Sequence, residues 1–251
     1  MSNKSLDVIT VVKNPGSELL LTLDSLMTIA THHSETVRWI VIDGSHTENP
    51  EFIGKIRSLE AYMHIEYTRE SDDGIYSAMN KGLAKVDSDF FIFINSGDTL
   101  DLRIINVLES INSEVFSGVS SWHDSFGNII QGARSRKPLR WLGIMPSHQA
   151  MIFPSKYKNT RYNTHWKISS DQDLKLKLWK KRELVFSNDV ISSCLIGGIS
   201  MQKLSLAEIF LRSRESGQIF SSHYNLMHAA FLRLAYFTNY LLRWNGKIVH
   251  K

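Results

Sequence analysis

Short apolar runs alternate with amphipathic segments through the first hundred residues. Each run is rich in Val, Ile or Phe and ends at polar or glycine-containing residues, which predicts four short strands: 6–13, 38–42, 63–67 and 90–94. Apolar residues recur at helical spacing in 17–30 and 74–86, and Asn49-Pro50 is typical of the start of another helix. Strands that alternate with helices in this way predict an α/β fold with a mostly parallel central sheet flanked by helices.

The pattern becomes less regular after residue 100. It predicts a helix over 101–111, an antiparallel strand pair over 115–122 and 128–132, a basic loop over 133–147, a helix over 169–181 and a strand near 184–187. Residues 203–243 are predicted to be mostly helical.

Charge is divided unevenly along the chain. Residues 1–130 contain 9 basic and 19 acidic side chains, whereas residues 131–251 contain 20 basic and 6 acidic ones. The formal net charge of +4 therefore combines two parts of opposite sign. Such a division indicates different binding partners for the two parts.

The composition excludes several classes of protein. With 43% hydrophobic and 22% charged residues, the chain is neither disordered nor fibrous. The single cysteine, Cys194, excludes a disulfide framework and a cysteine-based zinc site. The first residues lack the apolar stretch of a signal peptide, and no uncharged apolar run reaches the roughly 18–20 residues that cross a bilayer. These features predict a cytoplasmic protein.

Polar side chains follow each of the four predicted strands. Asn14 follows the first, Asp43 the second, the segment 69–73 the third and the segment 95–98 the fourth. Because ligands of open α/β sheets bind beyond the carboxyl ends of the strands, these residues mark a candidate site. Acids gathered there would repel one another unless a divalent cation or the donors of a ligand relieved the repulsion. A single acid at such a place can also be a turn residue or a helix cap, an alternative that applies to Asp98.

Several segments together resemble the family 2 glycosyltransferases of the GT-A fold. In the first half these are ITVVKN (9–14), IVIDGS (40–45), ESDDGIYSAMNKGL (70–83) and FIFINSGD (91–98). In the second half they are SHQAMIF (147–153), SSDQDLKLKLW (169–179) and IGGIS (196–200). The resemblance extends over about residues 6–200 and is greatest to the bacterial exopolysaccharide and O-antigen branch, including the colanic-acid transferases. It implies an inverting transfer of a sugar from a UDP- or GDP-sugar donor.

The resemblance implies that residues near the strand ends bind the donor: Thr10, Val12, Asn14, Asp43, Arg69, Glu70, Asp72, Asp73, Gly74, Asn80, Lys81, Asn95, Ser96 and Gly97. Asp43 matches the aspartate that hydrogen-bonds the nucleobase, and residues 72–74 match the segment along the sugar and diphosphate. Gly74 opens a predicted helix whose N–H groups and dipole can face phosphate. Asp43 could instead be a turn residue, and Lys81 is equally consistent with a solvated charge.

The segment Asn95-Ser96-Gly97-Asp98 occupies the place of the family's Asp-x-Asp metal motif. Asn95 replaces the first acid, so the resemblance leaves Asp98 as the predicted ligand of Mn²⁺ or Mg²⁺. Phosphate oxygens of the nucleotide would complete the coordination of the cation.

The resemblance also implies a catalytic base and an acceptor site. Asp171 matches the second member of the family's Glu-Asp pair, with Ser170 in place of the Glu. A carboxylate there would take the proton from the acceptor hydroxyl as it attacks the sugar. Ser170, His148 and Gln149 are predicted to contact the acceptor. Asp171 and Asp173 could instead complement a helix dipole, and His148 could be a structural histidine.

The second half of the chain is basic and aromatic. Residues 134–182 hold 13 basic side chains against Asp171 and Asp173, with Trp and Tyr interleaved. This composition is typical of proteins that lie on an anionic membrane and also of proteins that bind nucleic acid. No nucleic-acid-binding module is recognised, so we predict a peripheral position on the cytoplasmic face of the inner membrane and a polyprenyl-diphosphate-linked saccharide acceptor. The alternative is a solvated basic face with an amphipathic C-terminal helix packed on the core.

These predictions divide the chain into a GT-A domain over 1–202 and a helical, basic extension over 203–251. The domain would comprise a nucleotide-sugar-binding half over 1–100 and an acceptor half over 101–202. Two other functions were compared. A sugar-nucleotide pyrophosphorylase should open with a G-x-G-T-R loop, which the sequence lacks. A non-catalytic glycan- or lipid-binding relative would not need the two acids at 98 and 171.

Overall fold

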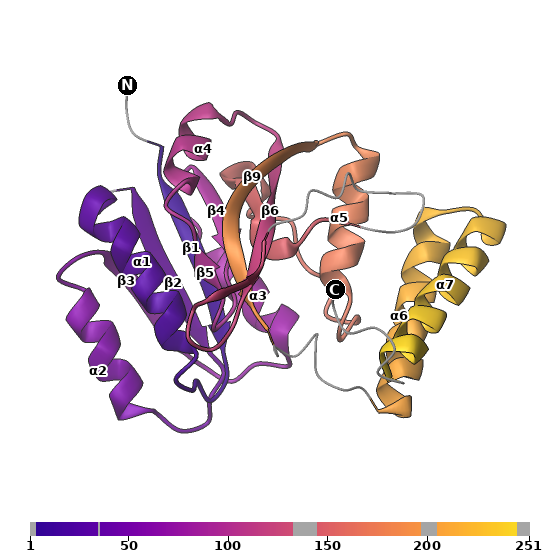
Figure 1. Cartoon of the computed structure of the whole chain (residues 1–251), viewed down its shortest axis with the longest axis horizontal. Coiled ribbons are helices and arrows are strands. Elements are labelled where there is room, and N and C mark those ends of the chain that lie inside the picture. The colour runs from indigo at the N-terminus through magenta and orange to yellow at the C-terminus, as the bar shows by residue number, and fades with distance from the viewer. Residues whose placement is uncertain (1–3, 35, 133–144, 197–204, 245–251) are drawn as a thin grey trace. The chain divides into compact units, whose positions relative to one another are not determined.

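The computed structural model describes residues 4–34, 36–132, 145–196 and 205–244 (Figure 1). Its elements are, in order, β1 (Leu6–Val12), α1 (Leu19–His33), β2 (Val37–Asp43), α2 (Pro50–Leu59), β3 (His64–Arg69), α3 (Ile75–Ala84), β4 (Phe90–Phe93), β5 (Thr99–Leu100), α4 (Ile104–Ser110), β6 (Val115–His123), β7 (Ile129–Gln131), β8 (Met151–Pro154), α5 (Ser170–Lys180), β9 (Leu184–Leu195), α6 (Leu206–His223) and α7 (Leu226–Trp244). Short 3-10 helices cover His148–Ala150 and Ser155–Tyr157.

The strands form one nine-stranded sheet in the order β3-β2-β1-β4-β8-β6-β9-β5, with β7 paired to β6. β1 is parallel to both β2 and β4, and β2 is parallel to β3, which confirms the parallel core predicted from the sequence. β8 is antiparallel to β4 and to β6, and β6 is parallel to β9. Because β8 alone is reversed between them, β6 and β9 run in the same direction as β4. The carboxyl ends of β1, β2, β3, β4, β6 and β9 therefore lie at one edge of the sheet.

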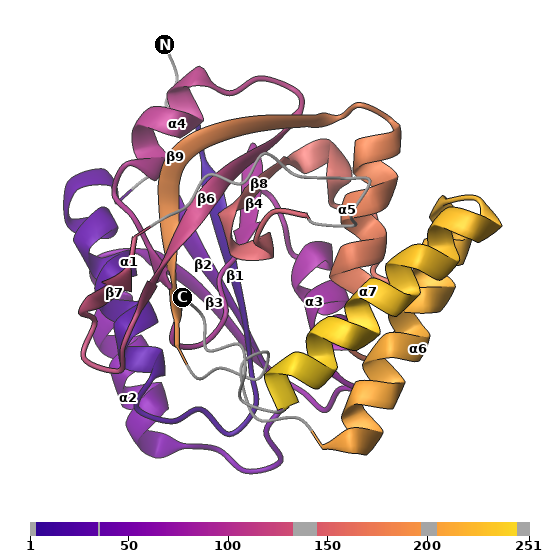
Figure 2. The same cartoon turned by 45° about the vertical axis from the view of Figure 1, so that its right-hand side comes forward.

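Helices cover both faces of the parallel strands (Figure 2). On one face, Leu6 and Val8 of β1 belong to a buried cluster with apolar side chains of α1 and α2, the direct result of the period-two alternation of a strand. On the other face α3 approaches closely: a Cβ at Gly82 would lie 2.5 Å from Cγ2 of Ile9. Glycine at this position is what allows the helix to pack on β1 and β2.

The elements expected from the sequence are present, with four differences. The first helix begins at Leu19 and not at residue 17. β8 and the two-residue β5 were not predicted, and β9, at 12 residues, continues to Leu195 beyond the short strand expected near 184–187. The predicted hairpin around Phe126-Gly127 is confirmed by the antiparallel pair β6 and β7.

The chain divides into two compact units that do not follow the predicted boundary at residue 202. The first comprises residues 1–136, 146–162 and 183–196, and the second comprises 137–145, 163–182 and 197–251. α5 is thus grouped with α6 and α7. The physical reason is a shared core in which Leu176 of α5 packs with Ile219, Phe220, Ala229 and Leu232.

Among the described residues, no helix combines the length and apolar character that a membrane-spanning segment requires. The predicted basic loop lies mostly outside the described residues, as does IGGIS beyond Ile196.

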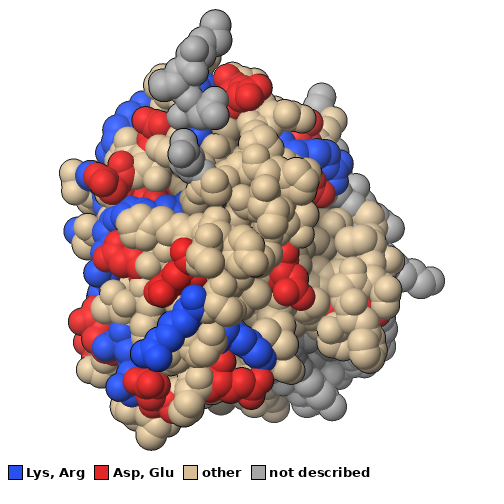
Figure 3. All heavy atoms as spheres, turned by 90° about the vertical axis from the view of Figure 1, so that its left-hand side faces the viewer, with Lys and Arg blue, Asp and Glu red and all other residues tan. Residues whose placement is uncertain are grey.

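The acidic excess of residues 1–130 does not form a continuous negative surface on the face drawn in Figure 3, where red and blue side chains are interspersed. Ion pairs account for part of this arrangement: Lys55 with Glu51 at 2.6 Å, Lys85 with Glu66 at 2.7 Å and Arg69 with Glu48 at 3.7 Å. Exposed pairs of this kind contribute little stability.

Asp7 holds the amino ends of the parallel strands together. Its fully buried carboxylate accepts two hydrogen bonds of 2.8 Å from the Arg38 guanidinium at the start of β2. It also accepts bonds from the N–H groups of Asp87 and Ser88 and from the Ser88 hydroxyl, which immediately precede β4. Burial alone would raise the pKa of Asp7, but the hydrogen bonds from Arg38 and Ser88 outweigh it and hold the pKa below its usual value.

We expect Asp7→Asn to lower the free energy of unfolding by roughly 3 kcal/mol, because it removes the buried anion and leaves the partly buried Arg38 with the longer, 3.4 Å ion pair to Glu66. Since the pKa of Asp7 is lowered in the folded state, its stabilisation is present above the unfolded value near 4 and lost as the pH falls through the folded value. Urea unfolding from pH 7 to pH 3 should therefore show a flatter acid limb in the variant. Glu51→Gln, at the exposed pair with Lys55, is the control and should change little. Equal effects of the two substitutions would contradict the role given to Asp7.

Candidate active site

The register of the parallel strands aligns the predicted site residues at one edge. Val12 is paired with Asp43, and Asp43 is paired with Arg69, so the loops after β1, β2 and β3 leave the sheet side by side. Ile94, just after β4, donates its N–H to the carbonyl of Ile9 and keeps the fourth loop in line with them. The strand-end acids and amides are thus brought together as expected.

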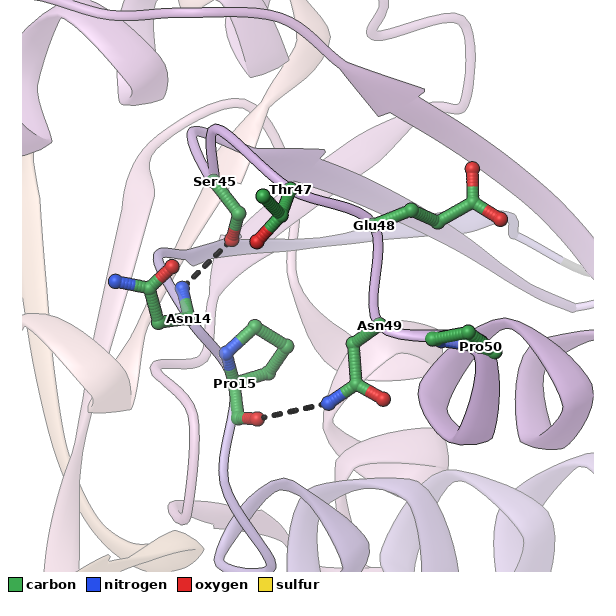
Figure 4. A pocket seen from close by; sticks show the side chains of 7 residues that line it. All are labelled: Asn14, Pro15, Ser45, Thr47, Glu48, Asn49 and Pro50. Carbon is green, nitrogen blue, oxygen red and sulfur yellow. Dashed lines mark hydrogen bonds between the residues drawn. The ribbon is translucent and has the colours of Figure 1, made fainter.

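A surface depression of about 320 Å³ lies where the loops after β1 and β2 meet (Figure 4). Seven residues line it: Asn14, Pro15, Ser45, Thr47, Glu48, Asn49 and Pro50. The Asn14 N–H donates to the Ser45 hydroxyl at 2.6 Å, and the Asn49 amide donates to the Pro15 carbonyl at 3.4 Å. These bonds hold the two loops together, and the polar groups around the depression can accept and donate hydrogen bonds to a planar heterocycle.

Asp43 is at the end of β2 and is fully buried. One carboxylate oxygen accepts the Ser45 N–H and the other accepts the Tyr67 hydroxyl, both at 2.8 Å. Burial and the bond to Asp43 raise the pKa of Tyr67 far above its usual value, so this hydroxyl stays protonated and donating. Each carboxylate oxygen still has a second lone pair, but the side chain is fully buried and does not line the depression.

The loop after β3 is held by charges from two directions. Arg69 points to the loop after β2, with its guanidinium 3.5 Å from the His46 carbonyl and 3.7 Å from a Glu48 oxygen. Lys81 of α3 donates to the Ser71 carbonyl at 2.6 Å and lies 3.4 Å from a Glu70 oxygen. Lys81 therefore binds the loop after β3. The sequence had suggested either a solvated charge or a direct contact with phosphate.

Residues 72–74 connect this loop to α3. One oxygen of Asp72 accepts the Gly74 N–H at 2.8 Å, and the other lies so close to Gly44 that a Cβ there would collide with it. Gly74 has φ of +117°, a conformation that a side chain would strain, and it precedes the first turn of α3 without a side-chain cap. Asp73 and Gly74 are exposed. This segment presents its backbone and two carboxylates to a ligand at the sheet edge.

Three residues predicted to bind the donor serve the core instead. Thr10 is fully buried and accepts a 2.9 Å hydrogen bond from the Trp39 indole, and Val12 is buried in β1. Both side-chain amide groups of Asn80 bind the backbone of Tyr162, at 2.9 Å to its carbonyl and 2.8 Å from its N–H. Side chains engaged in this way are not placed to contact a donor.

The segment Asn95–Asp98 forms a turn that Thr22 of α1 organises. The Thr22 hydroxyl accepts the Gly97 N–H at 2.9 Å and donates to the Asp98 carbonyl at 2.7 Å, and it is fully buried. Gly97 has φ of +90°, and a Cβ there would lie 2.7 Å from Cδ2 of Leu195. Asn95 and Ser96 are partly exposed on the turn.

Asp98 is 6% exposed, and its carboxylate accepts the Leu195 N–H at 2.9 Å. Burial raises its pKa to about 6, while the bond from Leu195, the charge of His123 and hydrogen bonds from Asn95 and Gln149 act in the opposite direction. Gln149, predicted at the acceptor, is therefore beside Asp98.

The Asp-x-Asp comparison needs a correction. The motif is three residues long, so alignment of its first acid with Asn95 places Gly97, and not Asp98, at the second. Neither position has a carboxylate, and Asp98 lies one residue further on. Among the described residues there is no group of three His, Cys, Asp or Glu side chains that could hold a metal. What fits a divalent cation is one carboxylate, Asp98, beside a buried imidazole nitrogen of His123 that has no hydrogen-bond partner in the described structure.

His148 occupies an aromatic cluster. It is buried, its Nε2 lies 2.6 Å from the Tyr162 hydroxyl, and its ring stacks on Phe93 at 5.1 Å. Tyr162 in turn stacks on Tyr76 of α3 at 5.6 Å. This environment favours the structural alternative for His148 over the predicted acceptor contact.

Asp171 and Ser170 lie in the second unit, in the first turn of α5. The Asp171 carboxylate is 27% exposed and lies 2.7 Å from Nζ of Lys175, one turn later and only 7% exposed. Ser170 is buried. Asp173 accepts a hydrogen bond from Lys177 and pairs with His223 of α6. Its side chain is 8% exposed, so Asp171 is the more accessible of the two acids.

The segment that leads into α5 is also fixed by α6. Glu215 is buried, and its two carboxylate oxygens accept the N–H groups of Lys167 at 2.7 Å and Ile168 at 3.0 Å. No local sequence pattern marks Glu215, Thr22, Tyr162 or His123, because each acts through a partner at a distance in the chain.

The sequence matches the model of glycosyl transferase family 2 over residues 7–165. The chain belongs to this family. It is therefore a glycosyltransferase, as the strand-end motifs predicted. Asp171 lies beyond the matched segment, so its role stays a prediction.

Solved structures support the GT-A fold class. TarS 1–349 of S. aureus in complex with UDP-GlcNAc has a TM-score of 0.66 at 14% identity, over 95% of this chain and 72% of that one. The mannosyltransferase PcManGT of Pyrobaculum calidifontis, in complex with GDP-Man and Mn²⁺, has a TM-score of 0.65 at 13% identity, over 99% and 77%. The chain spans 43% of the longer S. aureus TarS structure. Among curated protein sequences none matches the chain significantly.

We expect Thr22→Val to lower the free energy of unfolding by about 1–3 kcal/mol, because the isosteric change leaves the Gly97 N–H and the Asp98 carbonyl buried without a partner. The turn that carries Asn95 to Asp98 should also loosen, which proteolysis or hydrogen exchange of residues 95–98 would detect. Thr28→Val, which removes an exposed hydroxyl bonded to the Asp24 carbonyl on the same helix, is the matched control. Equal exchange in the two variants would exclude Thr22 as the organiser of the turn.

Proposed function

We propose that the protein is an inverting glycosyltransferase that moves one sugar from a nucleotide-sugar donor to a lipid-linked saccharide acceptor. The observation that carries the proposal is the polar depression at the carboxyl ends of β1 and β2, in a chain of glycosyl transferase family 2. The acceptor, the role in exopolysaccharide or O-antigen synthesis and the position on the cytoplasmic face of the inner membrane extend beyond the family assignment and are part of the proposal.

The donor is a UDP- or GDP-sugar. Two similar structures contain UDP-GlcNAc and GDP-Man, which supports a nucleotide sugar as the donor class. We assign the nucleobase to the depression, where Asn14, Ser45 and Asn49 offer hydrogen-bonding groups. The diphosphate then lies toward Gly74, where the dipole at the amino end of α3 favours an anion.

A divalent cation, Mn²⁺ or Mg²⁺, is assigned to Asp98. When bound, it supplies charge stabilisation to the departing diphosphate. The Mn²⁺ in the mannosyltransferase structure supports a cation in this fold. Because only one carboxylate is present in the turn, oxygens of the nucleotide supply most of the coordination, and affinity for the cation depends on the nucleotide.

Asp171 is assigned as the base that takes the proton from the acceptor hydroxyl. Its side chain is 27% exposed, and the ammonium group of Lys175 at 2.7 Å favours the ionised carboxylate that a base requires. Position in the first turn of α5 also favours the anion.

The acceptor and the membrane are assigned to the basic, C-terminal part. Residues 203–251 contain seven basic side chains against Glu208 and Glu215, and Glu215 is buried. α6 and α7 expose large apolar side chains: Leu206, Phe210, Leu226, Met227, Phe231 and Leu234. Apolar residues next to basic ones suit the interface of an anionic bilayer, where a polyprenyl-linked substrate is found.

We expect Asp171→Asn to reduce kcat by about 10²–10⁴-fold while donor affinity stays within a few-fold, because the amide cannot accept the proton. Sugar transfer to an extracted lipid-linked acceptor measures turnover, and calorimetry measures donor affinity. Asp189→Asn, at an exposed carboxylate of β9, is the control. If the Asp171→Asn variant turned over bound donor at the normal rate, Asp171 would not be the base.

A thermal-shift screen of UDP, GDP and their sugars with Mn²⁺ or Mg²⁺ tests the donor. A higher melting temperature with one nucleotide and with its sugar derivative supports a glycosyltransferase with that donor. Transfer of labelled sugar to lipid then distinguishes a glycosyltransferase from a non-catalytic relative. Release of inorganic diphosphate from a nucleoside triphosphate and a sugar phosphate would instead indicate a pyrophosphorylase.

We expect the double variant Phe231→Ser, Leu234→Ser to bind anionic vesicles at least about tenfold more weakly, since it removes two exposed apolar side chains of α7. Flotation with phosphatidylglycerol vesicles at low and high salt provides the measurement. Ile129→Ser, Ile130→Ser changes two similarly exposed residues of β7 and is the matched control. Equal binding by both variants and the wild type would contradict attachment through α7.

A further inference from the structure

His123 is the last residue of β6, at the edge of the sheet where the candidate site lies. It is 1% exposed and pairs in register with Leu195 at the end of β9. Its backbone carbonyl accepts the N–H of Ile196. The ring is therefore fixed at the end of a strand whose direction, set by the reversed β8, brings it to the same edge as Asp98.

The hydrogen bond of the ring defines its tautomer. Nδ1 lies 2.8 Å from the carbonyl oxygen of Asp124, which can only accept, so Nδ1 carries a proton. In the neutral ring Nε2 then holds a lone pair. Nε2 is buried and has no hydrogen-bond partner in the described structure. A buried acceptor without a partner is rare in proteins and indicates a group that a ligand completes.

Asp98 is connected to His123 through β9. Its carboxylate accepts the N–H of Leu195, the register partner of His123 on the neighbouring strand. The two side chains also interact electrostatically, since a protonated His123 ring lowers the pKa of Asp98 and so counteracts the effect of burial.

We propose that Nε2 of His123 is the second protein ligand of the divalent cation assigned to Asp98. The proposal rests on the cation of the proposed function. A histidine that binds a metal through one nitrogen usually donates its other N–H to a backbone carbonyl or a carboxylate, as His123 does to Asp124. Imidazole is a better ligand for Mn²⁺ than for Mg²⁺, so the site prefers Mn²⁺. The ligand lost from the turn at Asn95 and Gly97 is replaced from β6.

Another buried histidine lacks this arrangement. Nε2 of His148 lies 2.6 Å from the Tyr162 hydroxyl and is already engaged. The alternative is that a sugar hydroxyl donates to Nε2 of His123. The imidazole would then not bind the metal, and the experiment below would detect no coupling between the metal and a histidine nitrogen.

The experiment is pulsed electron paramagnetic resonance of Mn²⁺ bound to the full chain with UDP and, separately, with GDP. We expect a nitrogen coupling from a directly bound imidazole, and it should change in the protein labelled with ¹⁵N-histidine, which separates it from nitrogens of the nucleobase. This measurement requires no substitution. His123→Gln should abolish the coupling and weaken Mn²⁺ binding at least about tenfold, and the preference for Mn²⁺ over Mg²⁺ should decrease.

His64→Gln, which removes an exposed histidine of β3, is the control and should retain the coupling. Mn²⁺ binding with nucleotide but without a histidine coupling would overturn the proposal and leave the proposed function intact. A coupling that persists in His123→Gln would overturn it as well. If no Mn²⁺ binds with either nucleotide, the cation of the proposed function fails together with this inference.

Discussion

The alignment of β1 between β2 and β4 is the constraint on which the site depends. Parallel pairing fixes where each strand stops, and the pairing of Val12, Asp43 and Arg69 brings three loops to one edge. The buried carboxylate of Asp7 secures the opposite ends by binding Arg38 and the N–H groups before β4. One anion thus joins β1 to β2 and to the segment before β4, and so holds the three parallel strands in the alignment that places their loops at one edge. A site built on rigid strand ends requires little reorganisation on binding a ligand.

The antiparallel strand β8 has a separate consequence for function. By reversing direction between β4 and β6, it gives β6 and β9 the same direction as the parallel strands and extends the functional edge to them. In this arrangement Leu195 donates its N–H to the carboxylate of Asp98 and pairs with His123 on the neighbouring strand. Asp98 therefore lies between the parallel strands and the strands that follow β8. Its neighbours come from the turn after β4, from Gln149 and from β9, and not from one short motif.

The sequence predicted the features that depend on local pattern. The apolar runs gave the four parallel strands, and the polar residues after them marked the edge correctly. Thr10, Asn80 and His148 were assigned to ligands because they stand in or beside the motifs, whereas their partners, Trp39, Tyr162 and Phe93, become apparent only in three dimensions. β8 has four residues and β5 has two, too short for an alternating pattern to show. The pairing of His123 with Leu195 joins residues far apart in the chain, and no local signal precedes it.

The place of Asp171 changes how its chemistry can be tested. The sequence suggested a domain that ends at residue 202 and a separable extension, but α5 shares its core with α6 and α7, and Glu215 fixes the backbone just before Ser169. Removal of residues 203–251 would expose Leu176 and free the N–H groups of Lys167 and Ile168. A truncated protein would thus lose the support of α5 together with any membrane contact, and the two effects could not be separated. Substitutions on the exposed face of α7 leave the shared core in place, so they can separate attachment from catalysis.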